Sequence, residues 1–329
     1  MSVHWGMQKK RVLITDHAHP HLAQGLIRFG YEVVEQPAIS MDEVRQVIGQ
    51  YQGVVINSKI RMDQAMIDSA VRLEFIARLG SGLEIIDRAA ARKKHIAVFS
   101  APEGNCNAVA EHALGMLLCL ANHLLRADRQ VRHFSWHREM NRGWEIAGRT
   151  VGIVGMGHTG CAFARKLEGM GVRVVGHDLY NRDWVNRLPW VREVDATTIR
   201  READILSLHL PLSEETRHYV DKAYLSGCRQ GVVLINTSRG QCIHTADLVE
   251  ALESGMVRGA CLDVFELEKP DRQLEEAEEV YRHLHQMEQV VLSPHVAGWT
   301  VESLQRIADV LVEKIGDWIQ KGNDSEKSL

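Results

Sequence analysis

The sequence contains no apolar run of the roughly 20 residues that a membrane-spanning helix needs. Its first residues, Met1 to Arg11, also lack the apolar core of a secretion signal. Neither sign of charge dominates, because the formal net charge is only -4 at pH 7, and so there is no general basic field to attract nucleic acid. These absences predict a cytoplasmic protein that has neither a membrane nor nucleic acid as a partner.

Cysteine and histidine occur without the spacing of a disulfide framework or a metal site. The six cysteines stand singly in apolar segments and form no CxxC pair, so we expect reduced cysteines that pack in the core. The histidines of DHAHPH, His17, His19 and His21, surround Pro20 in an expected loop between a strand and a helix. A solvated loop is favoured there over a metal site, and we predict no bound metal.

What the sequence does contain is a repeated alternation of short β-branched runs with helical patterns. With 329 residues, 45% of them hydrophobic, the chain is long enough for two domains. Alternating strands and helices predict an α/β fold with two doubly wound parallel-sheet (Rossmann-like) domains joined by interdomain helices. The expected strands are residues 12–15, 31–34, 54–56, 75–77 and 96–99 in the first block and 151–154, 172–176, 205–208, 232–235, 259–262 and 290–292 in the second.

Two long helical patterns lie outside these blocks. The stretch from Ala108 to about Arg132 predicts one continuous helix between the domains. A last helix is expected from Val301 to about Gln320, returning to the first domain, and the polar tail GNDSEKSL predicts disorder. We therefore expect a discontinuous first domain of residues 1–106 plus 301–329 and a second domain of residues 107–300.

The segment TVGIVGMGHTG places Gly155, Gly157 and Gly160 between an expected strand and an expected helix. A tight turn, a close approach of pyrophosphate and close helix packing require glycine at these three positions of a dinucleotide site. The next expected strand ends at Asp178, which suits the ribose hydroxyls of NAD and would repel the 2′-phosphate of NADP. Arg182 nearby leaves some use of NADP open. We therefore expect residues 107–300 to be an NAD-binding domain.

Three polar residues, Arg239, Glu268 and His295, each follow an expected strand of that domain, in INTSRG, CLDVFELEKP and SPHVAGWT. Ligands bind beyond the carboxyl ends of parallel strands, so these side chains are expected to converge. Arginine can bind a carboxylate with two hydrogen bonds, and a carboxylate beside histidine orients the imidazole and favours its protonated form. Each residue alone suits an ordinary surface loop, but behind a nucleotide motif they predict hydride transfer to a 2-keto acid.

The motifs GMGHTG, HLPL, NTSRG, LDVFELEKP and PHVAGWT, together with GSGLEIID and APEGNCNAVAEHALGMLL, resemble the D-isomer-specific 2-hydroxyacid dehydrogenase family, phosphoglycerate dehydrogenase-like members in particular. The resemblance implies Arg239 as the substrate-binding arginine, His295 as the general acid/base, and Glu268 rather than Glu266 as its carboxylate partner. The cofactor contacts that it implies are His158, Thr159, Asp178, Thr237, Ser238, Arg239 through its backbone, Asp263 toward the carboxamide, and Gly298.

The substrate is expected to lie against the first domain. The loop of Gly80, Ser81 and Gly82 resembles the family's substrate-carboxylate loop, and Lys59 and Arg61 are available to hold a substrate phosphate or are simply solvated. A 3-phosphoglycerate-like acid is preferred over glyoxylate or hydroxypyruvate, which keeps glyoxylate/hydroxypyruvate reductase as an alternative. A non-catalytic NAD-sensing protein is the alternative from another class.

The stretch RADRQVRHFSWHREMNRGWEIAGR is basic and carries Trp136 and Trp144. Its embedded acidic residues, and its match to the segment between domains in the family, favour packing in a homodimer over binding of nucleic acid. The chain is also expected to lack the regulatory domain that some phosphoglycerate dehydrogenases append.

Overall fold

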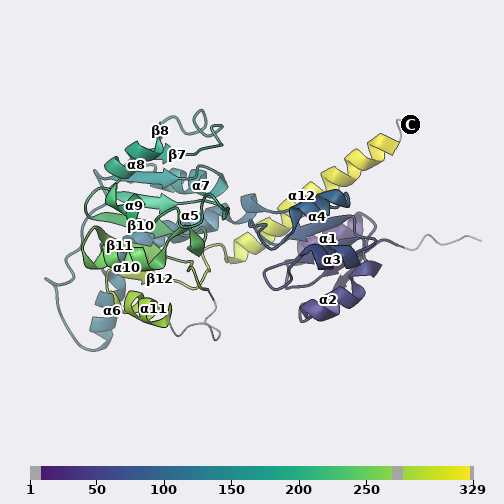
Figure 1. Ribbon diagram of the computed structural model, residues 1–329, viewed down its shortest axis with the longest axis horizontal. Coiled ribbons are helices and arrows are strands. Elements are labelled where there is room, and N and C mark those ends of the chain that lie inside the picture. The colour runs from purple at the N-terminus through teal and green to yellow at the C-terminus, as the bar shows by residue number, and fades with distance from the viewer. Residues whose placement is uncertain (1–8, 269–276, 327–329) are drawn as a thin grey trace, which may run out of the picture. The chain divides into compact units, whose positions relative to one another are not determined.

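The computed structural model describes residues 9–268 and 277–326 (Figure 1). The chain divides into two compact units, which we call unit 1 (residues 1–105 and 299–329) and unit 2 (residues 106–298). Each unit contains one sheet whose neighbouring strands are parallel, which confirms the predicted α/β class with two doubly wound sheets.

Unit 1 is built on a five-stranded sheet in the order β2-β1-β3-β4-β5. Its strands are short β-branched runs in the places where the sequence predicts them. Alternate residues along a strand face opposite sides of the sheet, and here they supply two separate hydrophobic clusters. The strands are β1 (Arg11–Ile14), β2 (Glu32–Glu35), β3 (Gly53–Ile56), β4 (Phe75–Arg78) and β5 (Ala97–Phe99).

The C-terminal helix completes the core of unit 1. Helix α12 packs against α1 and β5 and places Ile307, Leu311 and Ile315 in the hydrophobic cluster that the first strands form on that face (Figure 1). The helical elements of unit 1 are α1 (Pro20–Arg28), α2 (Met41–Val47), η1 (Ile48–Gln50), α3 (Gln64–Ser69), α4 (Arg88–Lys93) and α12 (Val301–Glu326).

Unit 2 is built on a seven-stranded sheet in the order β12-β11-β10-β9-β6-β7-β8. The chain runs outward from β6 in one direction and then returns to its other side at β9, so the order reverses between β6 and β9. Such a switch point is where dinucleotides bind in doubly wound sheets. The strands are β6 (Thr150–Val154), β7 (Arg173–His177), β8 (Arg192–Glu193), β9 (Ile205–Leu208), β10 (Val232–Asn236), β11 (Val257–Leu262) and β12 (Val290–Leu292). The two-residue strand β8 is missing from the sequence prediction because it has no apolar run.

Helices pack on the sheet of unit 2 around two hydrophobic clusters, one on each side (Figure 1). None of the six cysteines, all of which lie in the described part of the chain, forms a disulfide, and their side chains are buried or half-buried, in line with the packing role predicted for them. The helical elements are α5 (Pro102–Ala121, whose first residues belong to unit 1), α6 (Leu124–Arg132), α7 (His158–Leu167), α8 (Ala196–Glu202), α9 (Lys222–Ser226), η2 (Gly240–Cys242), α10 (Thr245–Glu253) and α11 (Ala277–Gln286).

The prediction of one continuous helix from Ala108 to Arg132 was wrong. The helix ends at Ala121, and α6 continues at an angle of 63° to α5. His123 between them has φ of 52°, a left-handed conformation that a right-handed helix cannot contain. Among the described residues no single helix is long and apolar enough to cross a membrane, and only this bent pair meets the requirement of length and composition when taken together.

The prediction of a disordered tail was also wrong for most of its length. Helix α12 continues to Glu326, because each further residue adds one backbone hydrogen bond to a helix that is already anchored by its buried face. Residues 327–329 lie outside the described part of the chain.

Candidate active site

The glycine-rich turn after β6 has the geometry of a phosphate-binding turn. Gly155 has φ of +91°, which side chains other than glycine rarely adopt, and a Cβ on Gly160 would collide with the carbonyl oxygen of Gly155. Gly157 is the N-cap of α7, and a Cβ placed on it would meet nothing within 4 Å. The turn is therefore tight on the protein side and open at the helix N-terminus, where free N–H groups can bind pyrophosphate.

Asp178 follows β7 and joins this turn to the next loop. Its carboxylate accepts hydrogen bonds from the backbone N–H of Met156 at 2.7 Å, of Tyr180 at 2.9 Å and of Asn181 at 2.7 Å. The side chain is only half-buried, so oxygen lone pairs remain for ribose hydroxyls. The ribose contact of Asp178 stays a prediction, and the structure adds that Asp178 holds the turn. His158 and Thr159 begin α7 directly beyond the turn.

The three predicted catalytic residues all lie at the carboxyl edge of the unit 2 sheet. Arg239 follows β10, Glu268 follows β11 and His295 follows β12, and these three strands are neighbours in the sheet. The loops also touch: Gly240 packs so closely on the backbone of Phe265 that a Cβ would not fit. The N–H of His295 donates to the carbonyl of Asp263 at 2.7 Å, so all three loops are linked.

His295 and Glu268 form a direct pair. The distance from Nδ1 of His295 to Oε2 of Glu268 is 2.8 Å, and both side chains are partly exposed, at 50% and 35%. An ionised carboxylate only accepts hydrogen bonds, so Nδ1 carries a proton in this pair. The other ring nitrogen, Nε2, is then the one left to exchange a proton with a ligand.

Glu266 has a different partner and a structural task. Its carboxylate binds His218 Nε2 at 2.6 Å and accepts from the N–H and the hydroxyl of Thr245 at 3.0 and 2.8 Å. Burial raises the pKa of Glu266, but these hydrogen bonds outweigh it, and the net pKa is lowered. The hydroxyl of Tyr281 accepts from the N–H of Leu267 at 2.9 Å. The side chain of Glu266 and the backbone of Leu267 are therefore both held by hydrogen bonds, and Glu268, the next residue, pairs with His295.

Asp263 at the end of β11 is fully buried and holds the loop that carries His295. Its Oδ1 accepts from the hydroxyl of Ser293 at 2.6 Å and from the N–H of Val296 at 2.9 Å, and its Oδ2 accepts from the N–H of Ala297 at 2.8 Å. The expected contact of Asp263 with the nicotinamide carboxamide stays a prediction. Gly298 directly follows this loop.

The turn after β10 is held by a buried asparagine that the sequence reading missed. Asn236 donates to the carbonyl of Arg239 at 2.9 Å and accepts from the N–H and the hydroxyl of Ser238 at 3.1 and 2.8 Å. The hydroxyl oxygen of Thr237 is buried and has no hydrogen-bond partner within the described chain, which suits a group that meets a ligand. A polar residue ending an otherwise apolar strand was the available signal for Asn236.

In unit 1 the predicted substrate residues lie in two loops. The guanidinium of Arg78 at the end of β4 packs against Gly80, and the hydroxyl of Ser81 donates to Asn105 Oδ1 at 2.8 Å. Gly82 follows and is buried. Lys59 and Arg61 are exposed side chains in the loop after β3. Their substrate contacts stay predictions.

Lys59 and the histidine loop also have partners of their own. Lys59 donates to the carbonyl of Pro37. His19 caps α1 by accepting from the N–H of His21, and His21 pairs with Asp309 of α12 at 2.9 Å. In the described part of the chain no group of His, Cys, Asp and Glu side chains is arranged to hold a metal ion.

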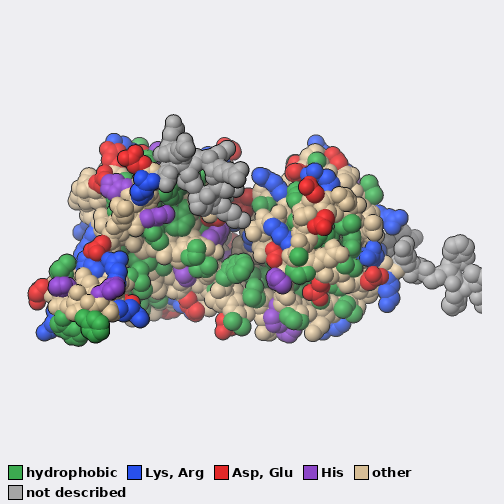
Figure 2. Space-filling view, turned by 90° about the horizontal axis from the view of Figure 1, so that it is seen from below, with side chains coloured by type: hydrophobic (Ala, Val, Ile, Leu, Met, Phe, Trp, Pro, Cys, Tyr) green, Lys and Arg blue, Asp and Glu red, His purple; other side chains and the backbone are tan. Residues whose placement is uncertain are grey.

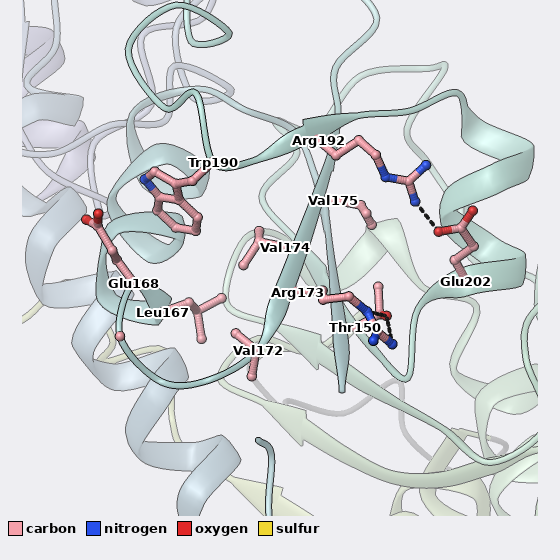
Figure 3. A pocket seen from close by; sticks show the side chains of 11 residues that line it. Thr150, Leu167, Glu168, Val172, Arg173, Val174, Val175, Trp190, Arg192 and Glu202 are labelled. Carbon is pink, nitrogen blue, oxygen red and sulfur yellow. Dashed lines mark hydrogen bonds and ion pairs between the residues drawn. The ribbon is translucent and has the colours of Figure 1, made fainter. Parts of the chain in front are cut away.

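A cavity of about 500 Å³ in unit 2 is separate from this carboxyl edge (Figure 3). Thr150 and Arg173, which begin β6 and β7, are among its lining residues, so it lies toward the amino ends of those strands. Figure 3 shows Arg173 turned to the hydroxyl of Thr150 and Arg192 paired with Glu202. The two arginines thus have partners among the lining residues, and the cavity is not the candidate active site.

The sequence of this chain matches one family model and several known dehydrogenases and reductases. A family model described as "D-isomer specific 2-hydroxyacid dehydrogenase, NAD binding domain" matches residues 114–297. A hydroxypyruvate reductase of Thermotoga maritima is 33% identical over 309 residues, covering 94% of this chain and 98% of that protein. A D-3-phosphoglycerate dehydrogenase of Archaeoglobus fulgidus is 29% identical over 305 residues, covering 93% of this chain and 56% of that protein.

A solved structure has a similar fold over most of its length. The TT0316 protein of Thermus thermophilus matches with a TM-score of 0.79 and 30% identity, covering 92% of this chain and 94% of that one.

Proposed function

The chain belongs to the D-isomer specific 2-hydroxyacid dehydrogenase family and is an NAD-dependent oxidoreductase acting on the CH–OH group of 2-hydroxy acids, and from this premise we propose that Arg239, Glu268 and His295 perform the reaction. The observation that carries this proposal is the 2.8 Å pair of His295 and Glu268 at the carboxyl edge of the sheet. When bound, the nicotinamide supplies or accepts the hydride at C2 of the substrate.

The remaining steps belong to side chains of this protein. In reduction, Nε2 of His295 donates a proton to the keto oxygen as C2 receives the hydride, and in oxidation it takes the proton from the hydroxyl. Glu268 keeps the imidazole oriented by accepting a hydrogen bond from Nδ1. Arg239 binds the substrate carboxylate through its guanidinium.

The NAD site consists of the open turn at Gly157, the N-terminus of α7 and Asp178. A free hydroxyl at Thr237 and the loop before Gly298 extend it toward the catalytic residues. His158, Thr159, Ser238 and Asp263 are further proposed cofactor contacts.

Hydroxypyruvate is the substrate to test first, because the relative that this chain matches over 98% of its own length is named a hydroxypyruvate reductase. A phosphorylated acid such as 3-phosphoglycerate is the second candidate, favoured by the exposed cations Lys59 and Arg61 on one loop of unit 1. Ser81 and Gly82 would hold the substrate carboxylate in either case.

A homodimer is also proposed, through the segment from Leu124 to Met140. Phe134 is 99% exposed and Trp136 is 76% exposed, and large apolar side chains left in water mark interaction surfaces. Figure 2 shows hydrophobic, basic and histidine side chains together on the projection at the left of the view, where α6 and the following loop lie. A cytoplasmic location remains a prediction from the sequence.

The decisive experiment measures NAD(H)-linked turnover on a panel of 2-keto and 2-hydroxy acids, including hydroxypyruvate, glyoxylate and 3-phosphoglycerate. The His295→Asn variant is expected to lose about 10²- to 10⁴-fold in kcat because the acid/base group is gone. Equal rates in both proteins would refute the role of His295. Tight NAD binding with no turnover on any acid would instead support the NAD-sensing alternative.

A further inference from the structure

The backbone of His295 is strained and needs an anchor. Its φ is 56°, in the left-handed region that residues other than glycine adopt uncommonly. Such a conformation persists only where surrounding contacts determine it. For His295 those contacts are its own N–H to the carbonyl of Asp263 and the next two N–H groups, of Val296 and Ala297, to the carboxylate of Asp263.

The carboxylate of Asp263 is in turn oriented by a hydroxyl. Asp263 has no exposed surface, and Ser293 Oγ lies 2.6 Å from its Oδ1. Burial of a polar group is costly unless it is hydrogen-bonded, and Oδ1 of Asp263 accepts two hydrogen bonds, one from Ser293 and one from Val296. Loss of the hydroxyl would let the carboxylate turn away from Val296.

His112 on helix α5 extends this series of hydrogen bonds from Asp263 and Ser293. Its Nε2 is 2.8 Å from Ser293 Oγ and 3.6 Å from Asp263 Oδ1. The hydroxyl has one proton, which it gives to the carboxylate, so His112 must donate through Nε2–H. His112 stands on α5, where the adjoining Ala113, Met116 and Leu117 are buried, so its position is set by the core of unit 2.

We propose that His112 and Ser293 are positioning residues, which orient the buried carboxylate of Asp263 and through it hold the histidine loop, residues 293–297, in its strained conformation. The consequence for catalysis rests on the proposed role of His295. Neither residue needs to touch substrate or cofactor. Their effect is to keep the imidazole aimed, and misplacement by about 1 Å can cost about 10²-fold in rate.

The test uses Ser293→Ala, His112→Leu and His112→Gln in the full-length protein. Ser293→Ala and His112→Leu remove a hydrogen-bonding group, whereas His112→Gln keeps an N–H donor. Ser226→Ala is the matched control, because Ser226 is an exposed residue of α9 whose hydroxyl bonds only locally to the carbonyl of Ala223.

Two readouts separate positioning from a general loss of structure. In Ser293→Ala and His112→Leu we expect kcat to fall about 10- to 100-fold, and His112→Gln to recover most of that loss. Hydrogen exchange of the N–H groups of Val296 and Ala297 should become about tenfold faster in the first two variants, as expected for loss of one hydrogen bond to a charged group. Ser226→Ala should behave as wild type in both.

Unchanged hydrogen exchange in the histidine loop of Ser293→Ala would overturn the proposal, as would equal losses in His112→Gln and His112→Leu. If the wild-type protein turned over no acid, the proposed function would fail, while hydrogen exchange would still decide the positioning role. The two failures are therefore distinguishable.

Discussion

In unit 1 the loop after β3 presents Lys59 and Arg61 to solvent, whereas in unit 2 the turns after β10, β11 and β12 are tied to buried Asn236 and Asp263. Both units are parallel sheets, with helices between the strands. The two units differ in the polar residues that end or follow their strands, which are exposed in the loop after β3 and buried at the ends of β10 and β11. Buried polar anchors hold catalytic side chains in one orientation, whereas exposed cations on a loop can attract a ligand but not orient it closely. This difference supports the proposed roles of unit 2 in catalysis and of unit 1 in substrate binding.

The largest expected difference is between two arginines, one in each unit. Arg239→Leu should lower kcat/KM about 10³-fold, because a half-buried guanidinium that binds a carboxylate contributes several kcal/mol. Arg61→Leu should stay within about tenfold on an unphosphorylated acid, since exposed charges contribute little. Steady-state kinetics of the two variants measure this contrast. Equal losses of kcat/KM in both would contradict the proposed roles of the two units.

A second contrast separates stability from cofactor binding within one turn. Gly160→Ala should lower the free energy of unfolding by about 3 kcal/mol, because its Cβ would collide with the carbonyl oxygen of Gly155. Gly157→Ala should leave stability unchanged but weaken NAD binding about tenfold, because its Cβ enters the space through which pyrophosphate approaches. Urea unfolding and NADH fluorescence titration measure the two effects. A stable Gly160→Ala protein would contradict the packing argument.

The buried histidine of unit 2 should make the stability of the protein depend on acid. His209 in unit 2 is buried, and burial lowers its pKa to about 4 from 6.5. The unfolded chain therefore takes up the proton first, so stability is full above pH 6.5 and falls by about 3 kcal/mol as the pH drops toward 4. Unfolding measured at several pH values should show this loss reduced in His209→Gln.

Exposed His17 in unit 1 supplies the control for that experiment. His17→Gln should retain the acid sensitivity of the wild type, because it removes an exposed side chain and leaves His209 in place. Identical pH profiles for His209→Gln and the wild type would show that His209 is not the group responsible.

The smallest effect is expected at Lys59. Lys59→Met should raise the KM for 3-phosphoglycerate about 2- to 5-fold and leave that for hydroxypyruvate unchanged, as exposed ion pairs are weak. The measurement is the KM for each of the two acids in Lys59→Met and in the wild type. A selective rise would assign the phosphate to unit 1, and an equal change for both acids would argue against the phosphorylated substrate.

Much of the fold could be predicted because each strand is a local β-branched run bounded by turns. The break at His123 could not, since nothing in the neighbouring residues forbids a continued helix, and β8 could not, since its two polar residues pair only because β7 is beside them. Among the site residues, the glycines were identifiable from spacing. His112 was not, because a histidine in an apolar helix has the pattern of an ordinary core residue.

The sequence by itself determined the order of strands and helices, the glycine spacing after β6 and the presence of an arginine, a glutamate and a histidine after three successive segments. Only the tertiary structure decided that Glu266 is held by His218 and Thr245, and that Asp263 serves as the anchor of the histidine loop. The reason is physical. These contacts join loops that are far apart in the chain, and they depend on the sheet register that places the ends of β10, β11 and β12 side by side.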